Sequence, residues 1–237
     1  MISARQIEKR YAGFQALHPL DLDVRAGEVF GFLGLNGAGK TTTLRMLAGV
    51  LPPTAGEVYI NGLDLQRQPV EARRVMGFIP DRPYVYEKLT AREFLQFIGE
   101  LYGMEGAELD QRIQEVLAEH ALQDWANALV ESFSHGMKQR LVLSGALLHN
   151  PLLLIVDEPM VGLDPSGARQ IKQTFRDFAE QGRTVFLSTH TLAVAAEVCD
   201  RIAIIHQGRI AVMGTIAEVC EGRPLEEVFL RVTGSEA

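Results

Sequence analysis

The sequence predicts an α/β fold in which a mostly parallel sheet is interrupted by an inserted set of helices. Three observations support this prediction. Short apolar runs alternate with helical patterns on both sides of the middle of the chain. The stretch from Thr90 to about Val130 has helical periodicity and carries no strand pattern. A glycine-rich segment lies directly between the first clear strand and the first clear helix.

Apolar runs mark the predicted strands. In chain order they are residues 29–33, 57–60, 75–79, 152–156, 184–188 and 202–206. Asn61-Gly62 predicts a tight turn after the second run, and Pro80 ends the third. Helical patterns lie between the runs, for example Leu44 and Leu47 before Gly49, and residues 169–180. This spacing is expected of parallel strands joined by crossover helices.

The middle of the chain is predicted to form a helical insert. Thr90 and Glu93 match the capping-box pattern of a helix N-terminus. The apolar residues that follow repeat at helical spacing: Phe94, Phe97, Ile98 and Leu101. The insert therefore divides the α/β core into two segments.

A terminal helix is predicted after Pro224. Its apolar residues fall at i, i+3, i+4 and i+7 and form one face: Leu225, Val228, Phe229 and Val232. We therefore expect one domain, residues 1–237, in three parts. The core comprises residues 1–88 and residues 142–215. The helical subdomain comprises residues 89–141, and residues 216–237 form a helical tail.

The composition is that of an ordinary globular domain. Hydrophobic residues make up 47% and charged residues 22% of the 237 positions, which excludes an intrinsically disordered or fibrous chain. The net charge is −7, so no long-range basic field attracts nucleic acid or an anionic membrane surface. We expect no nucleic-acid partner, and any phosphate ligand must be held locally.

We expect neither a membrane-spanning segment nor a secretion signal. The longest apolar stretch, residues 141–156, is interrupted by polar residues and Pro151, whereas a spanning helix needs roughly 20 apolar residues. The N-terminus lacks the apolar core of a signal peptide. Cys199 and Cys220 make neither a disulfide framework nor a metal cluster. The expected compartment is a reducing cytosol.

The glycine-rich segment matches the pattern G-x-x-x-x-G-K-[ST] in the strand-to-helix context that the pattern requires. Its glycines let backbone N–H groups surround phosphate, and the helix N-terminus adds its positive end. Lys40 is expected to reach the outer phosphates, and Thr41 to hold Mg²⁺. The predicted nucleotide-binding residues of this segment are Gly34, Leu35, Asn36, Gly37, Ala38, Gly39, Lys40, Thr41 and Thr42. The alternative is an ordinary glycine-rich turn.

Two carboxylates follow the apolar run 152–156. Ligands of an open parallel sheet bind at the carboxyl ends of its strands, so Asp157 is expected beside the glycine-rich loop. Asp157 would bind Mg²⁺ directly or through water. Glu158 is placed to polarise a water molecule against the γ-phosphate. The alternative is a solvated strand terminus.

A third motif, Ser134-His135-Gly136-Met137-Lys138-Gln139-Arg140, precedes this strand. It resembles the signature sequence of ABC transporter nucleotide-binding subunits, and the similarity covers essentially the whole chain. The resemblance implies a P-loop NTPase fold of the ABC ATPase type, in which the core, residues 1–88 and 142–215, carries an antiparallel N-terminal β portion. It also implies ATP and Mg²⁺ as ligands. It also implies a head-to-tail dimer in which Ser134 and Gly136 contact the γ-phosphate of ATP on the second subunit. Residues 134–136 also fit a helix cap, which can itself bind an anion.

Three further positions are carried over by the resemblance. His190 matches the switch histidine that touches the γ-phosphate, and Asp164 matches the loop that crosses the dimer interface. Tyr11 lies where the family places an aromatic ring that stacks on adenine. From the residues alone, His190 could be structural and Tyr11 an exposed strand tyrosine.

One position departs from the family pattern. Asp81 follows Phe78-Ile79-Pro80, where the family usually has a glutamine. A carboxylate can reach Mg²⁺ through water, but it cannot donate an amide hydrogen bond. We expect Asp81 to sense the metal or the attacking water, and residues 84–89 to form part of the docking surface for the membrane partner. His135 is also a less usual residue within the signature.

The resemblance implies an ATPase that drives a separate integral membrane permease, with Lys40, Glu158 and His190 as catalytic residues. The partners would be a second copy or a homologous ATPase subunit, and the permease. The location would be the cytoplasmic face of the cell membrane. The terminal helix resembles that of ATPases that drive bacterial exporters, although a helix that only covers the core fits equally. The alternatives are a soluble ABC-type ATPase acting on nucleic acid or ribosomes, and a regulatory module without turnover.

Overall fold

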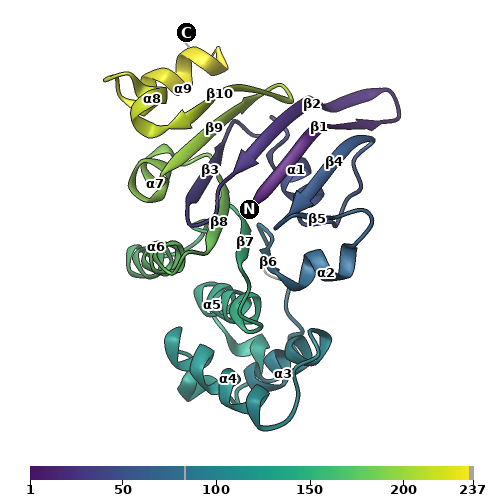
Figure 1. Ribbon diagram of the computed structural model, residues 1–237. Coiled ribbons are helices and arrows are strands. Elements are labelled where there is room, and N and C mark those ends of the chain that lie inside the picture. The colour runs from purple at the N-terminus through teal and green to yellow at the C-terminus, as the bar shows by residue number, and fades with distance from the viewer. Residues whose placement is uncertain (83, 235–237) are drawn as a thin grey trace.

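Two sheets and a helical insert make up the fold (Figure 1). The structure is a computed structural model and describes residues 1–82 and 84–234. Within these residues, one sheet has six strands in the order β10-β9-β3-β8-β7-β6, and the other has four in the order β2-β1-β4-β5. The fold is therefore α/β, as the sequence predicts.

The larger sheet contains most of the predicted strands. Its strands are β3 (Val29–Leu33), β6 (Met76–Ile79), β7 (Leu153–Asp157), β8 (Thr184–Thr189), β9 (Arg201–His206) and β10 (Arg209–Thr215). Neighbouring strands from β6 to β9 pair in parallel, and only β10 is antiparallel. Every residue of β3, β7 and β8 is buried, because helices or the second sheet cover both faces. The six predicted strands are confirmed, and their boundaries shift by at most two residues.

The smaller sheet is antiparallel. Its strands are β1 (Ile2–Tyr11), β2 (Phe14–Val24), β4 (Ala55–Ile60) and β5 (Leu63–Asp64). The sequence predicted β4 but did not delimit the β1–β2 hairpin, because polar and charged residues interrupt the apolar pattern of both strands. A tight turn at Ala12 and Gly13, both with positive φ, closes the hairpin and places Tyr11 opposite Phe14.

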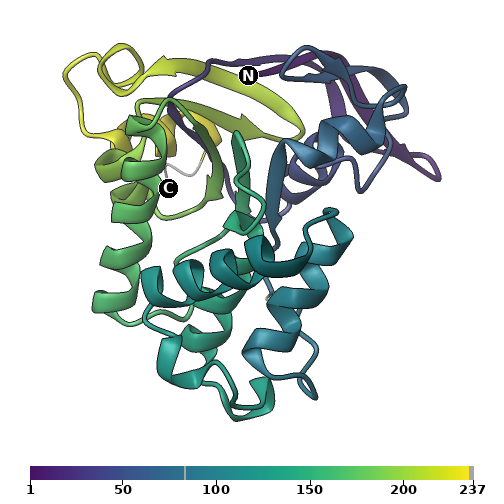
Figure 2. The same cartoon turned by 60° about the horizontal axis from the view of Figure 1, so that its bottom comes forward.

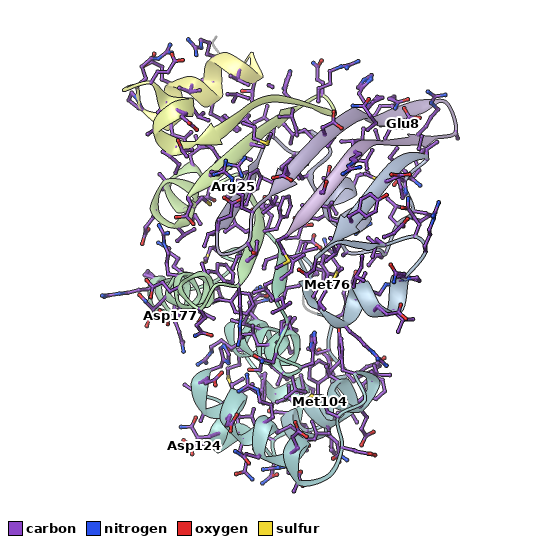
Figure 3. The ribbon with its side chains drawn as sticks, viewed as in Figure 1. Glu8, Arg25, Met76, Met104, Asp124 and Asp177 are labelled. Atoms are coloured by element: carbon purple, nitrogen blue, oxygen red, sulfur yellow. The ribbon has the colours of Figure 1, made fainter. Side chains whose placement is uncertain are left out.

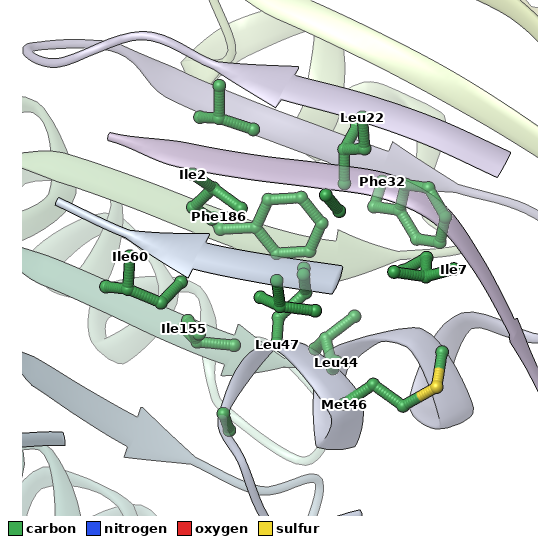
Figure 4. Close-up of a cluster of buried hydrophobic side chains, with 14 of the residues drawn as sticks. Ile2, Ile7, Leu22, Phe32, Leu44, Met46, Leu47, Ile60, Ile155 and Phe186 are labelled. Atoms are coloured by element: carbon green, nitrogen blue, oxygen red, sulfur yellow. The ribbon is translucent and has the colours of Figure 1, made fainter. Parts of the chain in front are cut away.

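A shared apolar core fixes the start of α1 (Lys40–Leu47) between the two sheets. Figure 4 shows Phe32 and Phe186 of the larger sheet in one cluster with Ile2 of the smaller sheet and Leu44 of α1. All four side chains are almost completely buried. Burying each of them stabilises the fold by about 1.5–3 kcal/mol, so the loop between β3 and α1 is anchored at both ends.

Helices cover the other face of the larger sheet. They are α6 (Pro165–Glu180), α7 (Leu192–Val198), α8 (Ile216–Cys220) and α9 (Leu225–Thr233). The predicted terminal helix is confirmed: Leu225, Val228 and Phe229 are buried in this layer. None of the helices in the described part of the chain combines the length and the apolar composition needed to cross a bilayer.

The insert forms a third apolar cluster beside the core (Figures 1 and 2). Its helices are α3 (Ala91–Leu101), α4 (Gly106–Glu119), η1 (Gln123–Trp125), η2 (Val130–Ser132) and α5 (His135–Leu147); the short α2 (Pro69–Arg74) precedes β6. Thr90 and Glu93 make the predicted capping box. Figure 3 shows Met76 on the core side of the boundary between the core and the insert, and Met104 on the insert side.

Helix α5 belongs to both parts. Leu141 and Leu148 pack in the insert cluster, whereas Val142, Leu143 and Leu147 pack in the core layer. The predicted boundary at residue 141 therefore falls inside a continuous helix. Helix α5 therefore joins the insert to the core.

Candidate functional site

The glycine-rich loop joins β3 to α1, as its sequence context predicts. Lys40 is the first residue of α1 and is 6% exposed. Its Nζ donates hydrogen bonds to the carbonyl oxygens of Gly34 at 2.7 Å and Leu35 at 3.3 Å. The first N–H groups of a helix have no partner within it, so the loop and the helix start together present donors and a positive charge to an anion.

Two of the glycines have steric reasons to be glycine. Gly39 has φ +111°, a conformation that residues with a side chain rarely adopt. A Cβ at Gly34 would lie 2.6 Å from the carbonyl oxygen of Ile205 on β9, which is closer than van der Waals contact permits. The loop is therefore pressed against the sheet, and its backbone can follow a phosphate chain closely.

Asp157 lies at the end of β7, directly beside this loop. Its Oδ2 accepts a hydrogen bond of 2.9 Å from Thr41 Oγ1, and its Oδ1 accepts one from Ser188 Oγ on the neighbouring strand. Asp157 and Ser188 are register partners in the parallel pair β7–β8. Asp157 is 2% exposed, so these hydroxyl donors hold an almost fully buried carboxylate in one orientation.

This donor set fits Mg²⁺ held together with a nucleotide. Mg²⁺ is usually bound by one or two carboxylates, substrate phosphates and waters. Thr41 and Asp157 supply one hydroxyl and one carboxylate that already lie within hydrogen-bond distance of each other. In residues 1–82 and 84–234, no cluster of three or more His, Cys, Asp or Glu could hold a metal by itself. Phosphate oxygens would therefore have to complete the coordination.

Glu158 joins the loop lysine to His190. Its Oε1 lies 3.7 Å from Lys40 Nζ and 2.9 Å from His190 Nδ1. A carboxylate has no hydrogen to donate, so His190 Nδ1 carries the hydrogen of this contact. The backbone of Glu158 has φ +49°, a strained conformation for a residue with a side chain. Such outliers cost about 1–3 kcal/mol and concentrate at functional sites.

The cleft at this edge of the sheet has a volume of about 370 Å³. It is lined by Tyr11, Phe14, Ala16, Leu35, Asn36, Gly37, Gly39, Lys40, Thr41, Thr42, Asp81, Asp157 and Glu158. Most of the predicted nucleotide residues therefore meet in one place. Gly34 and Ala38 lie within the same loop, where the N–H of Ala38 donates to the carbonyl oxygen of Leu35. His190 reaches the site through Glu158.

Phe14 and Ser188 also belong to the site, although neither is among the residues predicted for it. Phe14 is 68% exposed at the mouth of the cleft, opposite Tyr11, which is 44% exposed. Tracing the β1–β2 hairpin would have indicated Phe14, because cross-strand partners share a face. Ser188 directly precedes Thr189-His190, and pairing the two strand ends would have placed it against Asp157. Both signals depend on strand register.

Ser134, Gly136 and Asp164 lie outside the cleft lining. Ser134 caps α5, and its Oγ accepts a hydrogen bond from the N–H of Met137 at 3.3 Å. Asp164 caps α6 and accepts one from the N–H of Gly167 at 3.0 Å. Both caps are exposed at the molecular surface. The resemblance assigns Ser134 and Gly136 to ATP on a second subunit and Asp164 to the dimer interface, so contact with the cleft of their own chain is not expected.

A larger hollow of about 880 Å³ lies between α4, the end of α5 and α6. His149, on its wall, stacks on Tyr102 with ring centroids 3.6 Å apart. Burial lowers the pKa of His149 to about 4, so the ring is neutral near pH 7. This hollow contains none of the predicted site residues, and opposite charges line it. The smaller cleft is therefore identified by its chemistry and not by its size.

Comparison with known proteins agrees with this geometry. The family model described as ABC transporter matches residues 17–161. The linearmycin resistance ATP-binding protein LnrL of Bacillus subtilis is 37% identical over 93% of this chain and 71% of its own length. The bacitracin transport ATP-binding protein BcrA of Bacillus licheniformis is 40% identical over 89% of this chain and 68% of its own length.

A solved structure extends the comparison to the fold. The ATP-binding cassette MJ0796, described as a dimer in a post-hydrolysis state bound to ADP and Pi, superposes with a TM-score of 0.83. It is 27% identical, and the match covers 91% of this chain and 99% of the other. The family match over residues 17–161 includes the loop that joins β3 to α1 and the insert.

Proposed function

Because this chain belongs to the ABC transporter family and is an ATP-binding, ATP-hydrolysing subunit of it, we propose that two copies close head to tail around two ATP molecules. Their closure and reopening would drive a separate membrane permease. The observation that carries this proposal is the division of the site: the cleft holds Lys40, Asp157 and Glu158, whereas Ser134 and Gly136 lie outside it, at the start of α5.

Hydrolysis of the γ-phosphate depends mainly on positioning and charge neutralisation. The loop N–H groups and Lys40 bind the phosphates. Glu158 orients the attacking water, and its contact with His190 keeps its carboxylate turned toward the cleft. Bound Mg²⁺, held by Thr41 and Asp157, would neutralise charge on the phosphates. Asp81 lines the same cleft, and we assign it the sensing of metal or water that a glutamine performs elsewhere in the family.

The second copy would complete the site with its own Ser134 and Gly136. Ser134 and the first N–H groups of α5 form a helix start that favours an anion. Asp164 lies on the adjoining helix cap and would lie near the same interface. The dimeric arrangement of the MJ0796 cassette supports this proposal.

An exposed apolar surface on the insert supports a membrane partner. Tyr84 is 76% exposed, Tyr86 58% and Leu101 67%. The ring of Tyr86 packs edge-on against Phe97, with centroids 5.3 Å apart. Aromatic clusters of this kind on an otherwise polar surface commonly mark protein interfaces. We assign residues 84–89 and this end of α3 to permease docking, which would place the chain on the cytoplasmic face of the membrane.

The direction of transport is proposed from the relatives. One is named for resistance to linearmycin and another for transport of bacitracin. Resistance to an antibiotic is consistent with its removal from the cell, so we propose export. The identity of the exported compound would be determined by the permease, because the cleft of this chain is built for phosphate.

The test uses Glu158→Gln, which keeps the shape of the side chain and removes the carboxylate. We expect ATP binding to persist, phosphate release to fall by about 10³-fold, and an ATP-dependent dimer to accumulate. A tagged variant would then be recovered with ATP from detergent-solubilised native membranes, and co-purifying proteins identified by mass spectrometry. Glu108→Gln, an exposed residue of α4, is the matched control.

Each part of the proposal has its own contradicting result. Parental phosphate release by Glu158→Gln would remove Glu158 from its assigned role. A monomer at saturating ATP would contradict the closed pair of subunits. Recovery of ribosomal or DNA-associated proteins in place of a multi-spanning membrane protein would leave the ATPase assignment intact and overturn the permease.

A further inference from the structure

The first turn of α5 rests on the loop that follows Glu158. Two side chains on one face of the helix, at i and i+4, point at two carbonyls of that loop, those of Val161 and Pro159. Nε2 of His135 lies 3.3 Å from the carbonyl oxygen of Val161, and Nε2 of Gln139 lies 3.5 Å from that of Pro159. Gln139 is 3% exposed, whereas His135 lies at the surface.

His135 contacts the loop through a hydrogen bond and also through van der Waals packing. The backbone carbonyl of Val161 only accepts, so His135 Nε2 carries the hydrogen. The Cδ2–Nε2 edge of the imidazole ring also lies against Gly162, where an added Cβ would approach these two ring atoms to 2.9 Å. Gly162 has φ +77°, so this position requires glycine for both reasons. Beside it, Leu163 Cδ2 lies 3.7 Å from the place where a Cβ of Gly136 would stand.

The loop held in this way connects two distant parts of the proposed ATPase. At one end, the N–H of Glu158 donates to the carbonyl oxygen of Ser188 at 3.1 Å, which ties the loop to the cleft. At the other end, Asp164 caps α6. Hydrogen bonds from Val161 to Glu158 and from Leu163 to Met160 make the segment compact. A displacement of the loop at Asp164 would therefore also move the loop at Glu158.

We propose that His135 is a positioning residue that couples the two nucleotide sites of the dimer. This inference rests on the proposed function. In one chain, Glu158 acts on the ATP in its own cleft, whereas Ser134 and Gly136 act on the ATP of the second copy. His135 fastens the loop behind Glu158 to the helix that carries Ser134 and Gly136. Engagement of the signature at one site thus sets the position of Glu158 at the other.

The test compares His135→Ala, His135→Leu and His135→Gln in the full chain. Alanine removes the ring and the donor, leucine retains bulk without a donor, and glutamine retains an N–H that can reach the carbonyl oxygen of Val161. Steady-state ATP hydrolysis is measured against ATP concentration, and ADP binding to the single chain is measured by calorimetry. His18→Ala is the control: its ring contacts Arg209, far from α5.

We expect the parent to hydrolyse ATP with a Hill coefficient above one. His135→Ala and His135→Leu should lower kcat about fivefold, as loss of one hydrogen bond permits, and bring the Hill coefficient toward one. ADP affinity should stay at the parental value. His135→Gln should recover both parameters, and His18→Ala should leave them unchanged.

Three results would overturn the coupling. The first is parental kcat and cooperativity in His135→Ala. The second is parental behaviour in His135→Leu, because bulk alone would then suffice. The third is an equal loss of ADP affinity in His135→Ala, which would indicate general damage to the cleft. A parent chain without turnover or cooperativity would overturn the proposed function, and the coupling with it.

Discussion

The cleft differs from the surface formed by the N-terminal caps of α5 and α6, Ser134 and Asp164, together with Gly136, which we call the signature end. In the cleft, side chains meet partners from the same chain: the buried Asp157 receives two hydroxyl donors, and the partly buried Glu158 contacts both a lysine and a histidine. At the signature end, Ser134 and Asp164 satisfy only local helix caps and otherwise face the surface. One region is held together by contacts within the chain, and the other presents polar groups at the surface.

This difference separates two kinds of defect. A change in the cleft should impair the single chain, because the glycine-rich loop and Lys40, to which we assign phosphate binding, belong to that chain. A change at the signature end should leave the single chain intact and affect only what two copies do together. Binding to one chain and turnover by the pair are therefore the two measurements that distinguish the regions.

The largest effect is expected from Lys40→Ala in the cleft. Removing the ammonium group deletes charge-assisted hydrogen bonds to phosphate, so nucleotide affinity should fall about 10- to 100-fold. Turnover should fall by at least about 10²-fold more, because Lys40 also stabilises charge that develops on the phosphates. Calorimetry with ADP and ATP, followed by a phosphate-release assay, measures both quantities.

Lys172→Ala is the control for this change. Lys172 pairs with Glu197 on the surface of the helical layer, and such pairs contribute little to stability. Lys172→Ala should match the parent in both assays. If Lys40→Ala retained parental nucleotide affinity, the assignment of Lys40 to the phosphates would be wrong.

Gly136→Asp should give the second largest effect and a different pattern. An aspartate in the first turn of a helix is favourable, so α5 should form normally. Its carboxylate would face the γ-phosphate of the second copy, and juxtaposed like charges should lower turnover about 100-fold. ADP affinity of the single chain should not change. Sedimentation with ATP in the Glu158→Gln background would show whether the dimer is lost.

Gly136→Ala is the matched control, because the structure shows room for its methyl group. The nearest atom to a Cβ at this position is Leu163 Cδ2, at 3.7 Å, which is ordinary contact. The fold should therefore be unchanged, so any loss of turnover in Gly136→Ala reports crowding from the second copy. Weakened ADP binding in Gly136→Asp would contradict the separation of the two regions.

The features of this protein also differ in how far they could be predicted from the sequence. The strands were predictable because β3, β7 and β8 are buried on both faces and appear as uninterrupted apolar runs. Asp157 and Glu158 could be placed near Lys40 because the carboxyl ends of parallel strands meet at one edge. These inferences need only local pattern and one topological rule.

Other features depended on register or on packing. The sequence did not reveal that Ser188 holds Asp157, because this pair follows from the alignment of β7 with β8. The contact between His135 and the loop at Val161 joins residues that are distant in sequence. Dihedral strain at Glu158 has no sequence signal at all, since the residue type does not favour positive φ. Phe14 could not be predicted either, because its position opposite Tyr11 depends on the register of the β1–β2 hairpin. The mixed polar and apolar residues of both strands do not delimit that hairpin.

Phe14→Ala should give the smallest effect, at the outer edge of the cleft. Phe14 and Tyr11 are cross-strand partners that both line the cleft mouth, which suits them to contact a nucleobase. Loss of one aromatic contact with a base costs about 1–3 kcal/mol, and with Tyr11 retained we expect ATP affinity to fall about fivefold. Magnesium tripolyphosphate, which has no base, should bind Phe14→Ala as tightly as the parent. Val50→Ala removes a similarly exposed apolar side chain away from the cleft and should change neither affinity. Equal loss of both ligands in Phe14→Ala would show that the hairpin supports the phosphate loop rather than the base, and would make the cleft mouth part of the same rigid unit as Lys40.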